Sequence, residues 1–155
     1  MGGTRTLHVV FRQPTGRIGH QAIGSAVVEA DYEAKLTKLA LRRGIESLAD
    51  FSFYSPAQAA EAMRELDELG DVDFSANDFE PRFFDPQRGL DAVDGLLKHG
   101  RAFTTALRED LVFLRDVLGE ATRRGCQFYL VEPEPEEPMP FENLLLAERG
   151  RGRAG

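Results

Sequence analysis

One stretch of this chain predicts a long amphipathic helix. Four leucines and an alanine recur at spacings of four, three, four and three residues, at positions Leu107, Leu111, Leu114, Leu118 and Ala121. This spacing places all five side chains on one face of a helix of about four turns. A strand-like run at residues 126–131 begins directly after Gly125, a residue type that commonly ends helices. Because the chain must bury a helix and an adjoining strand together, we expect an α+β domain.

The N-terminal segment predicts a strand. Residues 5–12 alternate between apolar and more polar side chains, a pattern typical of a strand with one buried face. We expect this strand to pair with a strand at 126–132, because these are the two best strand patterns and they bracket the helices. The run at 22–28 is small and apolar, and we interpret it as a third, antiparallel strand that follows a turn at 13–19.

Start and stop signals predict four helices. Asp85 followed by Pro86 is the clearest start, because Asp accepts hydrogen bonds from free helix N–H groups and Pro suits the first turn. Asp31 is expected to cap the helix nearest the N-terminus. The expected helices span residues 31–43, 55–70, 85–100 and the leucine-striped segment. The predicted fold is therefore α+β, with a small antiparallel sheet whose N-terminal and C-terminal strands are adjacent, covered on one face by about four helices.

The length of 155 residues corresponds to one domain. We expect residues 1–132 to form a single α+β domain and residues 133–155 to form an extension. Prolines and glutamates alternate at the start of this extension, which favours an extended polyproline II conformation. A short apolar segment and a basic tail follow.

The composition excludes several classes of protein. A formal net charge of −7 argues against nucleic-acid binding, because neutralising phosphates requires clustered Lys and Arg. The single cysteine, Cys126, excludes an internal disulfide and a zinc cluster built on cysteines. No apolar run is long enough to span a bilayer, and the first residues lack the apolar core of a signal peptide. We therefore expect a cytoplasmic protein without membrane contact.

Three segments of the chain read SFYSP at 52–56, FFDPQRGL at 83–90 and GCQFYL at 125–130. Together they resemble a family of small bacterial proteins of unknown function. Members of that family share a Trp-Phe-Asp-Pro-x-x-Gly-Leu segment, a helix pair and a final Gly-x-x-Phe-x-Leu strand, and Phe83 stands where Trp is usual. The resemblance covers roughly residues 45–132 and implies an α+β fold. It implies no catalytic or binding residues.

Two segments have the composition of ligand-binding loops. Residues 15–20 are glycine-rich and follow a strand, but no helix N-terminus and no Lys-Ser/Thr pair follow to cradle a phosphate. Residues 71–78 carry oxygen ligands at alternate positions, as a calcium loop does. However, Ala76 and Arg82 stand where an EF-hand requires Gly and a bidentate Glu. We interpret the first segment as a surface turn and the second as a solvated acidic linker.

The remaining polar residues have structural interpretations. The three histidines, His8, His20 and His99, are far apart in the sequence and form no zinc-binding spacing. Cys126 is expected on the apolar side of its strand, where a thiol behaves as a small hydrophobe, although a pairing with His8 across neighbouring strands is conceivable. Asp85 is accounted for as a helix cap. We therefore expect no catalytic residue, no metal ligand and no cofactor.

The acidic segments are the strongest functional signal. Nine acids lie between residues 61 and 85, and five more lie between 132 and 142. We interpret this charge as a surface that attracts a basic protein partner, with solubility as the simpler explanation. The expected contact residues are Asp71, Asp73, Asp78, Glu80, Glu134, Glu136 and Glu137. The expected function is a non-catalytic protein-binding or regulatory module of the immunity-protein kind, and the alternative is a small enzyme with a site near the 14–20 loop.

Overall fold

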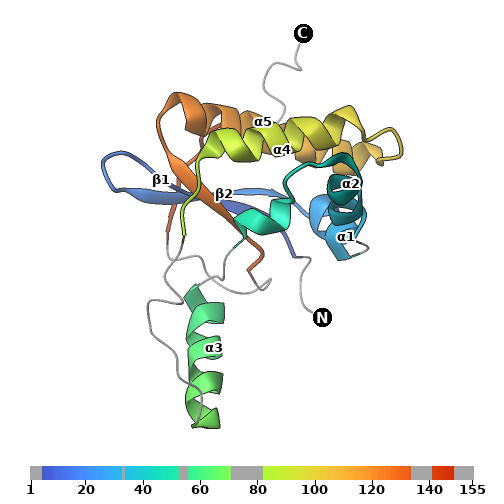
Figure 1. The fold of residues 1–155 in the computed structure, drawn as a ribbon. Coiled ribbons are helices and arrows are strands. Elements are labelled where there is room, and N and C mark those ends of the chain that lie inside the picture. The colour runs from blue at the N-terminus through green and yellow to red at the C-terminus, as the bar shows by residue number, and fades with distance from the viewer. Residues whose placement is uncertain (1–4, 33, 53–55, 71–81, 134–140, 149–155) are drawn as a thin grey trace.

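The protein is an α+β domain, described here from a computed structural model (Figure 1). The structure describes residues 5–32, 34–52, 56–70, 82–133 and 141–148. Within these ranges it contains four strands, five α-helices and one 3-10 helix. In chain order they are β1 (Leu7–Arg12), β2 (Ile18–Gly24), α1 (Ala26–Tyr32), α2 (Lys35–Arg43), η1 (Leu48–Phe51), α3 (Pro56–Leu69), α4 (Pro86–Lys98), α5 (Thr105–Arg123), β3 (Gln127–Val131) and β4 (Glu142–Asn143).

The sheet has the strand order β3-β1-β2-β4. The central strand β1 pairs antiparallel with both β2 and β3, so the N-terminal and C-terminal strands of the predicted domain are adjacent, as expected. The short strand β4 adds to the far edge of β2 in parallel. The sheet is therefore mixed, because a two-residue strand from the C-terminal segment joins three antiparallel strands.

The main hydrophobic core lies between one face of this sheet and the helices. Leu7, Val9 and Phe11 of β1 point into it, together with Phe128 and Leu130 of β3. The helices α1, α2, α4 and α5 supply the facing side chains, and Figure 1 shows α4 and α5 lying together over the sheet. The predicted leucine stripe of α5 is buried along its whole length. The alternating pattern of residues 5–12 and the leucine stripe of α5 thus correctly predicted the two layers of the core, the sheet and the helices.

The predicted third strand is wrong in its position. The strand β2 occupies residues 18–24, and residues 26–32 form the helix α1 instead. The expected helix at 31–43 is likewise two helices, separated at Ala34, which has a positive φ of 57°, and Asp31 lies within α1 rather than before it. A short apolar run does not distinguish strand from helix by periodicity.

The physical reason for α1 lies elsewhere in the chain. The side chain of Asp110, on α5, is buried with only 4% of its surface exposed. Its Oδ2 accepts a hydrogen bond of 3.2 Å from the Val27 N–H. A carboxylate at this position stabilises the free N–H groups and the positive end of the helix dipole. A residue that is distant in the sequence therefore supplies the cap that starts α1.

The other helix signals agree with the structure. Asp85 caps α4 by accepting a hydrogen bond of 3.0 Å from the Gln87 N–H, and Pro86 follows it in the first turn. The helix α3 begins at Pro56, as expected from its sequence. In the described residues, however, α3 contributes no side chain to either hydrophobic cluster, and Figure 1 shows it extending away from the sheet.

Two of the segments that carry the family resemblance contact each other in the core. Phe84, from FFDPQRGL, exchanges two backbone hydrogen bonds of 2.7 and 3.0 Å with Phe128, from GCQFYL. The Phe128 ring lies against Gly89 so closely that a Cβ added at Gly89 would stand 2.5 Å from the ring. Phe51 of η1 packs against the same ring. These contacts fix the start of α4 on β3.

Two helix glycines provide a matched test of this packing. Gly89→Ala should destabilise the protein by about 1–3 kcal/mol, because the new methyl group overlaps the buried Phe128 ring. Gly119→Ala should stabilise it by about 0.5–1 kcal/mol, because Ala is the better helix former and the nearest atom to the new Cβ is 3.9 Å away on Arg123. Urea unfolding of both variants measures the difference, and equal effects would contradict the described contact.

Residues 141–148, which follow the undescribed residues 134–140, pack on the sheet. Leu146 is buried in the main core. The side chain of Gln21 on β2, only 2% exposed, accepts a hydrogen bond of 2.8 Å from the Leu146 N–H and donates one of 2.5 Å to the Ala147 carbonyl oxygen. One buried amide therefore holds residues 146 and 147 against the edge of the sheet.

Replacing this amide should release the segment. Gln21→Leu leaves the buried Leu146 N–H and the part-buried Ala147 carbonyl without their partner, which costs about 1–3 kcal/mol. We expect faster amide hydrogen exchange at Leu146, with a lower free energy of unfolding. The exposed Gln127 of β3 is the matched control, and Gln127→Leu should change stability by less than about 0.5 kcal/mol. Unchanged exchange at Leu146 in Gln21→Leu would contradict the proposed attachment.

Candidate functional site

The acidic residues predicted to contact a partner lie outside the described part of the chain. Those residues are Asp71, Asp73, Asp78, Glu80, Glu134, Glu136 and Glu137. The calcium-like segment at 71–78 lies outside it as well. The described acids of the 61–85 region are Asp85, which caps α4, and four exposed acids of α3, Glu61, Glu65, Asp67 and Glu68, which lie beside Arg64.

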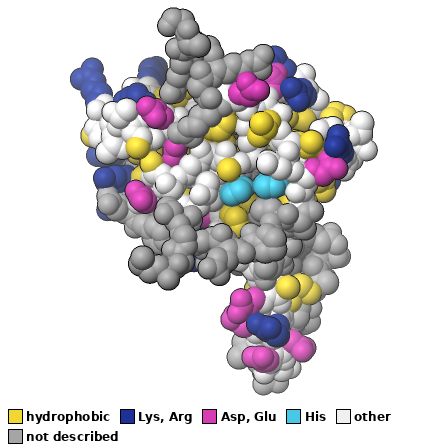
Figure 2. Space-filling view, turned by 180° about the vertical axis from the view of Figure 1, so that it is seen from behind, with side chains coloured by type: hydrophobic (Ala, Val, Ile, Leu, Met, Phe, Trp, Pro, Cys, Tyr) yellow, Lys and Arg dark blue, Asp and Glu magenta, His cyan; other side chains and the backbone are white. Residues whose placement is uncertain are grey.

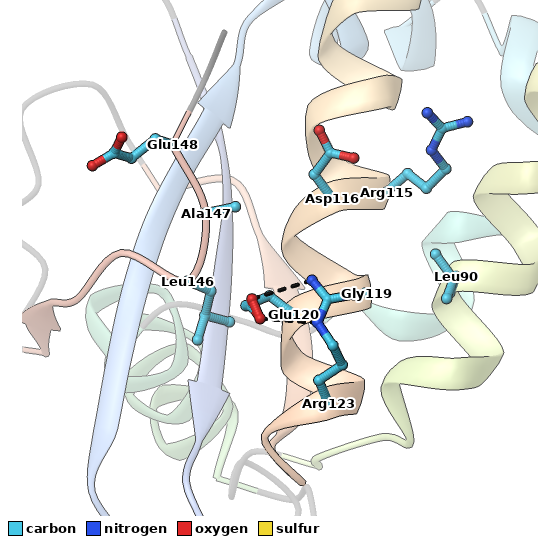
Figure 3. A pocket seen from close by; sticks show the side chains of 9 residues that line it. All are labelled: Leu90, Arg115, Asp116, Gly119, Glu120, Arg123, Leu146, Ala147 and Glu148. Carbon is cyan, nitrogen blue, oxygen red and sulfur yellow. Dashed lines mark hydrogen bonds and ion pairs between the residues drawn. The ribbon is translucent and has the colours of Figure 1, made fainter. Parts of the chain in front are cut away.

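A groove runs along α5 (Figure 3). It has a volume of about 610 Å³. One wall is α5, and Leu90 of α4 and residues 146–148 stand on either side. The lining residues are Leu90, Arg115, Asp116, Gly119, Glu120, Arg123, Leu146, Ala147 and Glu148.

Three of the five charged side chains that line this groove take part in ion pairs. Arg123 donates two hydrogen bonds, of 3.0 and 3.1 Å, to the carboxylate of Glu120, and these bonds raise the pKa of the guanidinium. Arg115 lies 3.9 Å from Asp94 on α4. The described lining contains no histidine, cysteine or serine that could act as a nucleophile or as a base near neutral pH.

The loop expected to hold the alternative enzyme site is a hairpin turn. The Gln13 N–H donates to the Arg17 carbonyl oxygen and the Gly16 N–H donates to the Gln13 carbonyl oxygen, at 2.9 and 2.8 Å. Gly16 has a φ of 91°, which favours glycine. The strand β2 follows directly, so this turn lacks the helix N-terminus that a phosphate loop requires.

The conceivable pairing of Cys126 with His8 does not occur. His8 lies opposite Val131 at one end of β3, whereas Cys126 precedes the other end of that strand. Cys126 is buried in the main core, and burial raises the pKa of its thiol. Both features agree with the predicted role of this cysteine as a small core hydrophobe.

A histidine pair on the second face of the sheet is the feature that sequence reasoning missed. His8 lies opposite Ala22, and His20 lies opposite Val10, so the two rings are diagonal neighbours on one face. Their Nδ1 atoms are 3.2 Å apart and their ring centroids are 5.3 Å apart. Figure 2 shows histidine side chains adjacent on the molecular surface, next to hydrophobic groups. The predicted strand at 22–28 left His20 outside the hairpin, so its proximity to His8 was not predicted. The correct register of β1 and β2 brings the two residues together.

The environment of the pair favours neutral imidazoles. Burial, together with the smaller effect of the neighbouring His20, lowers the pKa of His8 to about 4. Burial also lowers the pKa of His20. The same face carries a small hydrophobic cluster of Val10, Tyr129 and Val131, where burial raises the pKa of the Tyr129 hydroxyl to about 12.

The lowered pKa values predict a loss of stability in acid. In the unfolded chain His8 takes up a proton near pH 6.5. In the folded chain it stays neutral down to about pH 4. Folding stability contributed by this neutral group is therefore complete above pH 6.5 and declines as the pH falls towards 4.

Urea unfolding of the wild type and of His8→Gln, in buffer with a metal chelator, checks this prediction. The stability of His8→Gln should fall less steeply between pH 6.5 and 4 than that of the wild type. His99→Gln, which changes the exposed histidine that ends α4, should follow the wild type. Parallel curves for the wild type and His8→Gln would refute the assigned pKa shift.

Comparison with known proteins adds no assignment, since no family model, no curated protein and no solved structure matches this chain. The described helices also include none with the length and hydropathy needed to span a bilayer. The arguments for function therefore rest on the chemistry and geometry of the chain itself.

Proposed function

We propose that this protein is a non-catalytic binding module that uses its acidic region to recognise a basic protein partner. The observation that carries the proposal is the helix α3. It extends away from the sheet (Figure 1), and within the described residues it adds nothing to the hydrophobic clusters. A helix that stabilises the core so little is available for contact with another molecule.

The charge pattern of α3 supports this role. Glu61, Glu65 and Glu68 are exposed and recur at spacings of four and three, which aligns them along one face of the helix. The half-buried Met63 and Leu66 fall on the opposite face by the same helical period. The three glutamates therefore form an outward acidic ridge, referred to below as the α3 ridge.

The ridge continues in sequence into the predicted contact residues. The acids at positions 71, 73, 78 and 80 follow directly after α3. A concentration of one sign of charge accelerates the encounter with an oppositely charged partner and favours it over others. An immunity-type protein that neutralises a basic toxin is one example of such a module, offered here by analogy. We further propose that the protein is cytoplasmic and that it belongs to the bacterial family that its sequence resembles.

A charge-reversal experiment tests the proposal. The variant Glu61→Lys/Glu65→Lys/Glu68→Lys inverts the α3 ridge. The control Glu29→Lys/Asp50→Lys/Asp91→Lys makes the same change of net charge at exposed acids on α1, η1 and α4. Both proteins and the wild type are used as bait in extracts of the native host at low and high salt.

We expect a basic protein to be retained by the wild type and by the control but not by the ridge variant. Its retention should also weaken as salt screens the charges. Retention of the same proteins by all three baits, or binding that is indifferent to salt, would overturn the proposal. Circular dichroism of each bait verifies that all three are folded.

The alternative of a small enzyme near the 14–20 loop gains no comparable support. The hollow beside that loop, of about 370 Å³, is lined by Arg12, Gln13, Pro14, Gly16, Gly125 and Gln127. Arg12 is engaged there, since it donates to Gln127 and lies 4.3 Å from the centroid of the Phe83 ring. These residues offer no acid and base pair for catalysis.

A further inference from the structure

We propose that His8 and His20 form a chelating site for one divalent transition-metal ion of the zinc class. The site lies on β1 and β2 and is independent of the α3 ridge and of the proposed partner. The inference starts from the facing Nδ1 atoms of the two rings, 3.2 Å apart.

The separation of these atoms matches that of two ligands on one ion. A zinc ion lies about 2.0–2.1 Å from a histidine nitrogen and prefers tetrahedral angles, which places two such nitrogens about 3.3–3.4 Å apart. The observed distance of 3.2 Å therefore lies within a few tenths of an ångström of that separation. Imidazole nitrogen is also a ligand type that suits zinc, copper and nickel ions.

The backbone holds the two rings ready for binding. His8 and His20 belong to adjacent antiparallel strands that pair in continuous register from His8 to Arg12, and the register shifts between Leu7 and His8. The strand β1 is further held by β3 on its other edge. Ligands placed on paired strands lose little freedom on binding an ion, so the site is preorganised.

The protonation change on binding is balanced. Without an ion, one ring carries its proton on Nδ1 and donates a hydrogen bond to the Nδ1 lone pair of the other ring, which carries its proton on Nε2. When an ion binds, that ring moves its proton from Nδ1 to Nε2 through solvent, and both Nδ1 lone pairs bind the ion. Both rings stay neutral, so no proton is released. Both histidines are only half-buried, which leaves the remaining coordination positions to water or to an external ligand.

Isothermal titration of the full, untagged chain with zinc chloride tests the proposal. The wild type should bind one ion. Changing a residue that only supports a metal ligand costs about 10–100-fold in affinity, so His8→Gln and His20→Gln should each weaken binding by at least about tenfold. His99→Gln is the matched control and should bind as the wild type does. Thermal unfolding without metal verifies that each variant is folded.

Nuclear magnetic resonance of the imidazole nitrogens gives a readout on the wild type alone. Zinc should shift the Nδ1 resonances of His8 and His20 and leave those of His99 unchanged. The proposal is overturned if the wild type binds no zinc, if the double variant His8→Gln/His20→Gln binds as tightly as the wild type, or if zinc leaves the two Nδ1 resonances unchanged.

Discussion

The packing of the Phe128 ring is the contact on which the rest of this fold depends. The ring is fully buried on β3 and leaves no room for a side chain at Gly89. Phe84 pairs with the backbone of the same residue, and Phe51 packs against the ring from η1. The sheet, the start of α4 and the connection through η1 are thereby fixed at one point. Because interiors are close-packed, a change at any of these positions affects all three elements.

Two buried polar side chains join segments that are distant in the sequence. Asp110 caps α1 from its position on α5, and Gln21 holds the backbone of Leu146 and Ala147. A buried polar group costs free energy unless it is hydrogen-bonded, so each of these groups specifies one arrangement of its partners. The C-terminal residues up to Glu148 become part of the groove along α5 for this reason.

The two faces of the sheet have different roles. The helices α1, α2, α4 and α5 bury one face in the main core. In the described residues, the other face carries a small hydrophobic cluster and the histidine pair, and the acidic helix α3 stands apart from both clusters. The histidine pair therefore lies on the face of the sheet opposite the main core.

The sequence by itself determined the layers of this protein. Alternation in β1 and the leucine stripe of α5 were sufficient to predict the fold class and the adjacent terminal strands, because burial of one face follows directly from periodicity. Only the tertiary structure decided where β2 ends and α1 begins, since the cap comes from Asp110. It also decided the pairing of His8 with His20. Strand register brings these residues together, and register depends on a turn whose length the local pattern did not define.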